Sequence, residues 1–268
     1  MDYTTGCLKS PVDVRDYRIA CVSEETFPEE FEVSTLPKVK NQSSVSSCVA
    51  HASSSILEYH ELLAGRENKL STNFIYGIQK SECGYEGKGM YLRDACKIVC
   101  NYGDMLESDC PGNTEIPECW EKAEKALEDE EAKSRAKSFR IKSYFSCSSE
   151  NDIKKALMNY GPVLASFKWY KSYKTDKNGV LTTEQKDESG YHAVMIYGWN
   201  KTGFKCQNSW GTAWGKKGRF IVPFEIKVAE ARCFVDALDT DIIVPKRNVF
   251  LDFFYKVLNF VLNLFKKD

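Results

Sequence analysis

The hydrophobic and polar positions first form a regular pattern just after residue 47. Across 48–64 (CVAHASSSILEYHELLA) the apolar residues recur at helical rather than strand spacing. Serines within 43–47 offer oxygens that can cap a helix N-terminus, and Gly65 is a natural stop. The pattern therefore predicts a helix that begins at Cys48, and a further helix is expected near 89–101.

The pattern changes from helical to strand-like in the second half of the chain. Residues 121–137 are almost all charged helix formers, which indicates a solvated surface helix, and 151–160 predict a short helix. After that the apolar period moves toward two, which is typical of short strands. The strand-like runs are 163–167, 192–199, 203–210 and 218–224. Helices followed by antiparallel strands predict an α+β fold, with two lobes and a cleft between them.

The two ends of the chain differ from its body. The first 38 residues are polar with spaced prolines, and we expect an extended lead-in. At the other end, a polar linker precedes 249–265, an apolar stretch with one polar stripe at helical spacing. The stripe consists of Asp252, Lys256, Asn259 and Asn263. Three alternatives remain open for this amphipathic helix: it lies in a membrane interface, it packs on the body or on another subunit, or it spans a membrane.

Composition and charge narrow the function classes. A chain of 268 residues with 43% hydrophobic content can bury the core of one large domain or of two lobes. The net charge of −1 gives no basic face that would indicate a nucleic-acid partner. The 11 cysteines form no pair of CxxC motifs, so we expect no metal site. They are interpreted as small buried hydrophobes, or as one or two disulfides in an oxidising compartment.

The N-terminus gives an expectation about location. It lacks the basic and apolar regions of a secretory signal peptide, which favours an intracellular address. Membrane association through 249–265 is the alternative that the amphipathic helix leaves open.

Cys48 is the candidate nucleophile. A helix N-terminus lowers the pKa of a thiol, and small neighbouring residues would let a substrate carbonyl approach the sulfur. The chain has only three histidines that could act as its base. His51 shares the helix of Cys48 and is expected to be a partly buried helix residue, while His60 is expected at the surface. His192 begins an apolar strand, where an imidazole can face a helix-borne thiol.

Two amide side chains complete the candidate site. The Asn208 amide oxygen could accept the imidazole N–H of His192 and fix the orientation of the ring, and Trp210 could shield that hydrogen bond from water. Gln42 precedes Cys48 by six residues, within reach of a carbonyl oxygen beside the nucleophile. With the backbone N–H of Cys48 it would form a two-donor oxyanion hole.

Three sequence blocks together resemble the papain family of cysteine peptidases. They are KNQSSVSSCVAHA around Cys48, GYHAVMIYGW around His192 and QNSWGTAWGKKGRF around Asn208. The blocks stand in the family's order and at fitting distances, and the resemblance covers about 36–224. The segment SPVDVRDYR resembles the short leaders of prokaryotic and viral members.

The resemblance implies a cysteine-type endopeptidase that needs no cofactor and acts on a peptide or protein substrate. Cys48 would attack the carbonyl to form a thioester, and His192 would protonate the leaving amine. The stretch EGKGMYLRDACK resembles the Gly-rich segment that holds the substrate backbone in the family. Gly89 and Met90 are therefore expected to hydrogen-bond the residue upstream of the scissile bond, and with Trp210 they form the candidate substrate-binding set.

The resemblance also implies a division of the chain. A helical lobe at about 45–140 and a β-barrel-like lobe at about 141–238 would enclose the active-site cleft. Together they form a peptidase domain at 36–238. A leader at 1–35 would precede it, and the linker and amphipathic helix at 239–268 would follow.

Departures from the family pattern lie around the nucleophile and in the leader. Val45 replaces a cysteine that is normally disulfide-bonded, and Val49 and His51 replace aromatic residues. The family's long inhibitory propeptide is absent, and the shorter leader is hypothesised to lie along the surface or to plug the cleft. Two alternatives use the same residues: an inactive binding protein on this fold, and a thiol isopeptidase or peptide ligase.

Overall fold

The computed structural model describes residues 4–13, 16–18 and 26–236. The helix predicted at 249–265 lies outside them. Among the described residues, no helix combines the length and apolarity that crossing a bilayer requires.

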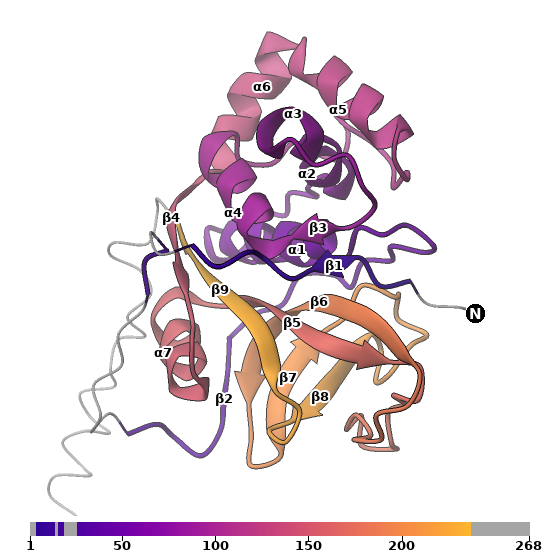
Figure 1. The fold of residues 1–268 in the computed structure, drawn as a ribbon. Coiled ribbons are helices and arrows are strands. Elements are labelled where there is room, and N and C mark those ends of the chain that lie inside the picture. Colours follow the sequence, from indigo (N-terminus) through magenta and orange to yellow (C-terminus); the bar gives the residue numbers. More distant parts are fainter. Residues whose placement is uncertain (1–3, 14–15, 19–25, 237–268) are drawn as a thin grey trace, which may run out of the picture.

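Most helices form one lobe, which stands above the strands in Figure 1. They are α1 (Cys48–Leu63), α2 (Thr72–Gly77), α3 (Gln79–Cys83), α4 (Leu92–Asn101), α5 (Glu118–Leu127), α6 (Glu130–Ala136) and the 3-10 helix η1 (Lys137–Phe139). The remaining helix, α7 (Glu150–Tyr160), lies beside the sheet of the other lobe. Its N-terminus has a capping box in which Ser149 and Asp152 satisfy each other's backbone N–H groups.

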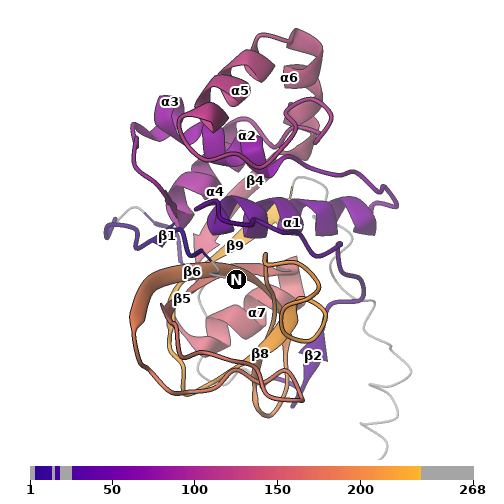
Figure 2. The same ribbon diagram turned by 90° about the vertical axis from the view of Figure 1, so that its right-hand side faces the viewer.

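The other lobe is a curled sheet (Figures 1 and 2). Its strands are β1 (Cys7–Leu8), β2 (Phe31–Glu32), β3 (Met90–Tyr91), β4 (Ile141–Ser146), β5 (Val163–Tyr170), β6 (Glu188–Trp199), β7 (Gly203–Gln207), β8 (Arg219–Pro223) and β9 (Val228–Asp236). The order is β3-β1-β6-β5-β9-β4, with β2 and β7 also paired to β6, and β8 paired to β7. Among these pairings only β1–β3 is parallel. The α+β fold with a helical lobe and a barrel-like lobe is confirmed.

Helix α1 lies between the two lobes and positions the candidate nucleophile at its first residue (Figure 2). Of its 16 residues, all but Leu62 and Leu63 are buried. Its core includes Ala193 and Met195 from β6 as well as residues of the helical lobe. The helix that carries Cys48 is therefore packed on the strand that carries His192.

The expectations for the helices hold in part. The surface helix expected over 121–137 is wrong in detail: two helices, α5 and α6, meet near Asp129, whose carboxylate caps α6 by accepting from the N–H groups of Glu131 and Ala132. Ser47 precedes α1 but makes no side-chain cap bond. Its hydroxyl instead bonds Asn113 Oδ1 at 3.2 Å.

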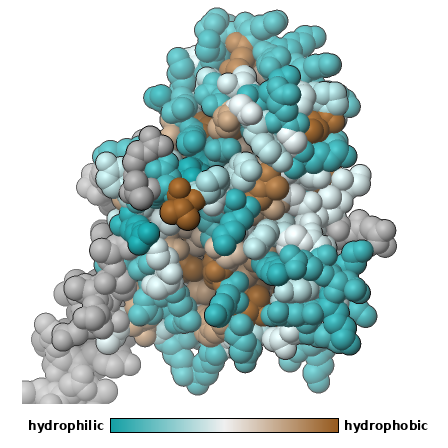
Figure 3. All heavy atoms as spheres, in the orientation of Figure 1, coloured by the Kyte–Doolittle hydropathy of each residue, from teal (hydrophilic) through white to brown (hydrophobic). Residues whose placement is uncertain are grey.

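Hydrophilic residues cover most of the face shown in Figure 3, and the apolar residues that do show gather near its middle, between the lobes. The N-terminal segment crosses between the lobes on this face (Figure 1). The strand pairing follows that path, because Cys7 of β1 pairs with Met90 of β3 on one side and with Tyr191 of β6 on the other. The segment that we call the leader, residues 4–18, is thus part of the sheet.

Candidate active site

Cys48 and His192 approach each other where α1 packs on β6. Both residues are fully buried. The backbone N–H of Ala193, the residue next to His192, is hydrogen-bonded to the Cys48 sulfur. The two side chains that the sequence paired from opposite parts of the chain therefore lie at one site.

The imidazole of His192 is held by one nitrogen and free at the other. Its Nε2 lies 2.7 Å from Asn208 Oδ1. An amide oxygen only accepts hydrogen bonds, so Nε2 carries the proton and Nδ1 has the lone pair. Nδ1 is buried and has no hydrogen-bond partner in the structure. Trp210 stacks on the ring at a centroid distance of 4.4 Å, as its expected shielding role requires.

Gln42 is fixed on both sides of its amide. Its Oε1 accepts from the Ser209 hydroxyl at 2.5 Å, and its Nε2 donates to the Val45 carbonyl at 2.9 Å. The second Nε2 hydrogen is directed to the carbonyl of Thr4 at 3.0 Å. Trp210 Nε1 donates to the same carbonyl at 3.2 Å. The amide expected in an oxyanion hole thus already binds a backbone carbonyl, which belongs to the leader.

The leader fills the groove beside the nucleophile. The Gly6 N–H is bonded to the Cys48 sulfur, and the Met90 N–H donates to the Gly6 carbonyl at 2.8 Å. Only glycine fits at position 6, because a Cβ there would lie 2.1 Å from the Ser46 carbonyl oxygen. Thr5 adds a hydroxyl hydrogen bond to the Ser189 carbonyl at 2.6 Å.

The two predicted backbone-binding residues behave differently. The N–H of Gly89 is bonded to the Tyr76 hydroxyl at 3.2 Å, and its carbonyl accepts from Gln79 Nε2 at 3.1 Å. Met90 is the residue whose N–H holds the leader backbone. Gly89 contributes its conformation, since its φ of 89° lies in the region that favours glycine.

Burial decides the charge state of the site while the leader is in place. It raises the pKa of the Cys48 thiol to about 11, although the backbone N–H groups of Ala193, Gly6 and Val49 act in the opposite direction. The expectation of a lowered thiol pKa at the helix N-terminus is therefore wrong for this covered form. Burial likewise lowers the pKa of His192 to about 4, against the raising effect of Asn208.

The other two histidines lie away from this pairing. His51 is buried as expected, with Nδ1 3.0 Å from the Ser47 carbonyl oxygen, and burial lowers its pKa to about 3. His60 was expected at the surface, and that is wrong. It is only 4% exposed, because the far end of α1 is covered too, and its Nδ1 lies 3.7 Å from a carboxylate oxygen of Asp236.

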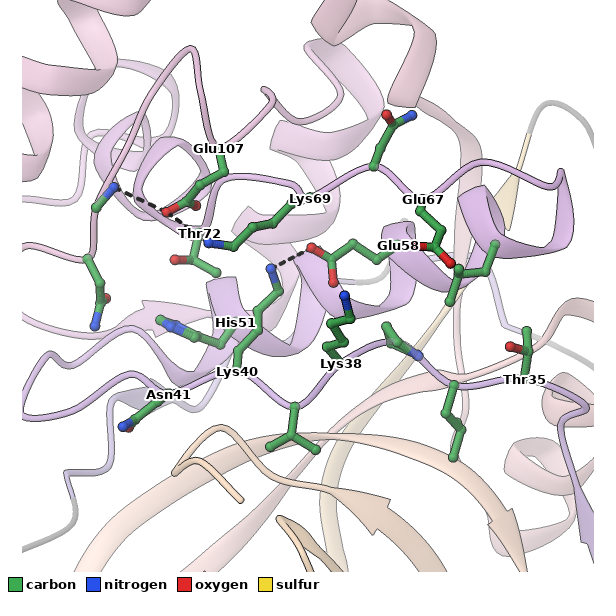
Figure 4. Close-up of a pocket in the computed structure, with 17 residues that line it drawn as sticks. Thr35, Lys38, Lys40, Asn41, His51, Glu58, Glu67, Lys69, Thr72 and Glu107 are labelled. Atoms are coloured by element: carbon green, nitrogen blue, oxygen red, sulfur yellow. Dashed lines mark hydrogen bonds and ion pairs between the residues drawn. The ribbon is translucent and has the colours of Figure 1, made fainter. Parts of the chain in front are cut away.

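A cavity of about 740 Å³ opens beside the middle of α1 (Figure 4). Its charged groups largely pair with one another: Lys40 with Glu58 at 2.6 Å, and Lys69 with Glu107 at 3.6 Å. Neither Cys48 nor His192 is among the residues that line it. The reactive groups therefore meet in the groove that the leader fills, not in this cavity.

Three features of the site were missed in the sequence. Ser209 orients the Gln42 amide, and Asn113 Nδ2 donates to the Gln42 carbonyl at 2.7 Å. Ser209 stands in the QNSWG block, which could have indicated it, whereas Asn113 has no recognisable motif. The third feature is the leader itself, whose contacts with Gln42 and Met90 span the groove.

Comparison with known proteins gives the same picture. Cathepsin B-like cysteine proteinase 3 of Caenorhabditis elegans is 26% identical over 231 residues, which cover 74% of this chain and 62% of that protein. Falcipain-2b of Plasmodium falciparum is 27% identical over 231 residues, covering 77% of this chain and 43% of that protein. The chain thus spans less than two thirds of the length of these relatives.

Solved structures show the likeness in fold. Xylellain, a cysteine protease from Xylella fastidiosa, superimposes with a TM-score of 0.74 at 22% identity, covering 87% of this chain and 96% of that one. The Carica candamarcensis cysteine protease CMS1MS2, in complex with E-64, gives 0.59 at 18% identity, covering 78% and 99%. The profile of the papain family of cysteine proteases matches residues 27–235, and the chain belongs to that family.

Proposed function

We propose that the chain is a cysteine endopeptidase that hydrolyses peptide bonds through a thioester. Cys48 is the nucleophile, His192 is the general base and then the acid, and Asn208 orients the imidazole. Gln42 and the Cys48 backbone N–H stabilise the oxyanion. In the first step Nδ1 of His192 takes the thiol proton and the sulfur attacks the carbonyl carbon. The imidazolium then protonates the leaving amine, and water releases the acyl group.

The observation that carries this proposal is the state of the His192 ring. Nε2 is committed to Asn208 at 2.7 Å, so the lone pair is on Nδ1. Nδ1 is buried without a hydrogen-bond partner. A buried unpaired nitrogen costs free energy unless it has a use, and here a thiol stands at the neighbouring backbone position.

The leader supports the role of Gln42. The Thr4 carbonyl accepts from Gln42 Nε2 at 3.0 Å, so this donor reaches a backbone carbonyl in the groove. A substrate carbonyl at the same donor would gain a charge-assisted hydrogen bond as its oxygen becomes negative. Removing one donor of this kind typically lowers kcat by about 10²–10³-fold.

A substrate and the leader compete for the same groups. Gln42 and the Met90 N–H are occupied by leader carbonyls in this form. The leader must therefore leave the groove before a peptide binds there. Solvent then reaches Cys48 and His192, and the burial that keeps both groups neutral is relieved.

The proposal is tested by cleavage of a mixed peptide library, with products identified by mass spectrometry. The full chain is compared with Cys48→Ala and with Cys83→Ala, a half-buried cysteine on α3 that serves as the control. We expect Cys48→Ala to lose at least about 10³-fold in rate and Cys83→Ala to keep it. Equal rates for all three proteins would refute the proposal, and joined rather than hydrolysed products would indicate a peptide ligase.

A further inference from the structure

A second anchor holds the leader some distance along its path from the nucleophile. Asp16 binds two arginines, Arg93 from α4 and Arg232 from β9. Arg93 donates to both carboxylate oxygens, from Nε at 3.1 Å and from Nη2 at 2.6 Å. Arg232 Nη1 lies 2.9 Å from Asp16 Oδ2. The leader carboxylate therefore joins an arginine of each lobe.

The arginines are built into the protein rather than displayed on its surface. The side chains of Arg93 and Arg232 are 9% and 4% exposed. Glu230 is the other carboxylate of this cluster: its Oε1 lies 3.0 Å from Arg232 Nε, and its Oε2 accepts the N–H of Ser10 at 3.1 Å. Two guanidinium groups thus face two carboxylates. If Asp16 leaves, the cluster carries an excess positive charge.

That charge sits in a place where it needs a partner. A poorly hydrated guanidinium that loses its carboxylate keeps its desolvation cost without the compensating attraction. The forked contact of Arg93 with both oxygens is specific for a planar carboxylate and cannot be copied by an amide, which offers one acceptor.

The path of the leader places the arginine pair within the substrate groove. Gly6 contacts Cys48 and Met90, and Ser10, four residues on, contacts both Glu230 and Arg93. The arginines thus lie beyond Met90, on the side away from Gln42. By the family resemblance, Met90 holds the substrate residue upstream of the scissile bond, so the pair faces the upstream part of a bound peptide.

We propose that Arg93 and Arg232 form a carboxylate-binding subsite, which Asp16 fills in the covered form and an acidic substrate side chain fills once the leader has left. This inference rests on the proposed peptidase function for the word substrate. The binding itself does not depend on catalysis. The enzyme accordingly selects peptides with Asp or Glu upstream of the cleaved bond.

The test measures binding in a chain that cannot cleave. Fluorescein-labelled peptides are made in pairs that differ only by Glu or Gln at one position, and that position is moved along the peptide. They are titrated into Cys48→Ala protein that also carries Asp16→Asn, which empties the subsite. We expect the Glu peptide of at least one pair to bind at least about tenfold tighter than its Gln twin.

Two further variants assign the effect to the arginines. Adding Arg93→Gln abolishes the preference, and adding Arg93→Lys, which keeps the charge without the fork, lowers it. Glu30→Gln in place of Asp16→Asn removes an exposed acid from the N-terminal region, leaves Asp16 in the subsite, and gives weaker binding of the Glu peptide.

Equal affinities within every pair, or a preference that survives both Arg93 variants, would overturn the subsite. Two variants of different severity are used so that failure of one to fold, checked by circular dichroism, leaves the other to decide. Failure of the proposed function gives a different result: the chain with Cys48 intact would bind the Glu peptides selectively and leave them uncut.

Discussion

Replacing Gly6 with valine should expose the active site by forcing the leader out of the groove. The added Cβ would stand 2.1 Å from the Ser46 carbonyl oxygen and 2.7 Å from its Cα, both backbone atoms. Ser46 cannot move aside easily, because its N–H donates to Glu115 Oε2 at 3.0 Å just before α1 begins. The leader is therefore the part that gives way.

The size of the effect follows from the hydrogen bonds that are lost. Displacement breaks those from Met90 to Gly6 and from Gln42 and Trp210 to the Thr4 carbonyl. At roughly 1 kcal/mol net for each, the covered form loses about 3 kcal/mol. The fraction of uncovered protein then rises about a hundredfold, as long as it starts small.

The assay is the initial rate of cleavage of a fluorogenic peptide, together with the rate at which iodoacetamide labels Cys48. Both rates should rise between about tenfold and a hundredfold in Gly6→Val. Lys9→Ala changes an exposed side chain of the same leader and should leave both rates unchanged. If Gly6→Val labels and cleaves no faster than the native chain, the reasoning that the leader blocks the site is wrong.

Three further predictions concern single groups. In the Gly6→Val background, Gln42→Ala should lower kcat by about 10²–10³-fold with little change in KM, since the lost hydrogen bond strengthens in the transition state. Asn208→Ala should lower kcat roughly tenfold or more, because His192 loses the contact that fixes its proton on Nε2. Burial raises the pKa of Asp16, but hydrogen bonds from Arg93 and Arg232 outweigh this and hold it below its ordinary value. Its contribution to leader docking is complete above the ordinary value of about 3.9 and is lost as pH falls through the lower docked value. Added pepsin should therefore cut the leader faster as pH falls below about 4, and this pH step should be missing in Asp16→Asn.

Some of the site could be predicted because its residues carry local patterns. Cys48 begins an amphipathic run, His192 begins an apolar strand, and Asn208 stands in a block with Ser209 and Trp210. These positions are set by secondary structure, so the sequence indicates them before any tertiary contact is known. The contact between His192 and Asn208 confirms the expected orientation.

Other features depend on contacts between distant parts of the chain. Asp16 meets Arg232 across more than 200 residues, and no periodicity links them. His60 looked like a surface residue because its helix was judged alone, whereas both lobes cover that helix. The thiol pKa of Cys48 was misjudged for the same reason: the helix N-terminus is local, but the burial that outweighs it comes from the leader.

The position of α1 has a consequence for how the molecule can move and melt. Because this helix belongs to the core of the helical lobe and also packs on β6, separating the lobes would expose apolar surface on both sides of it. Such opening is expensive, so traffic into the groove depends on the leader rather than on a hinge between lobes. For the same reason the two lobes should unfold cooperatively, as one calorimetric transition in which the van't Hoff and measured enthalpies agree.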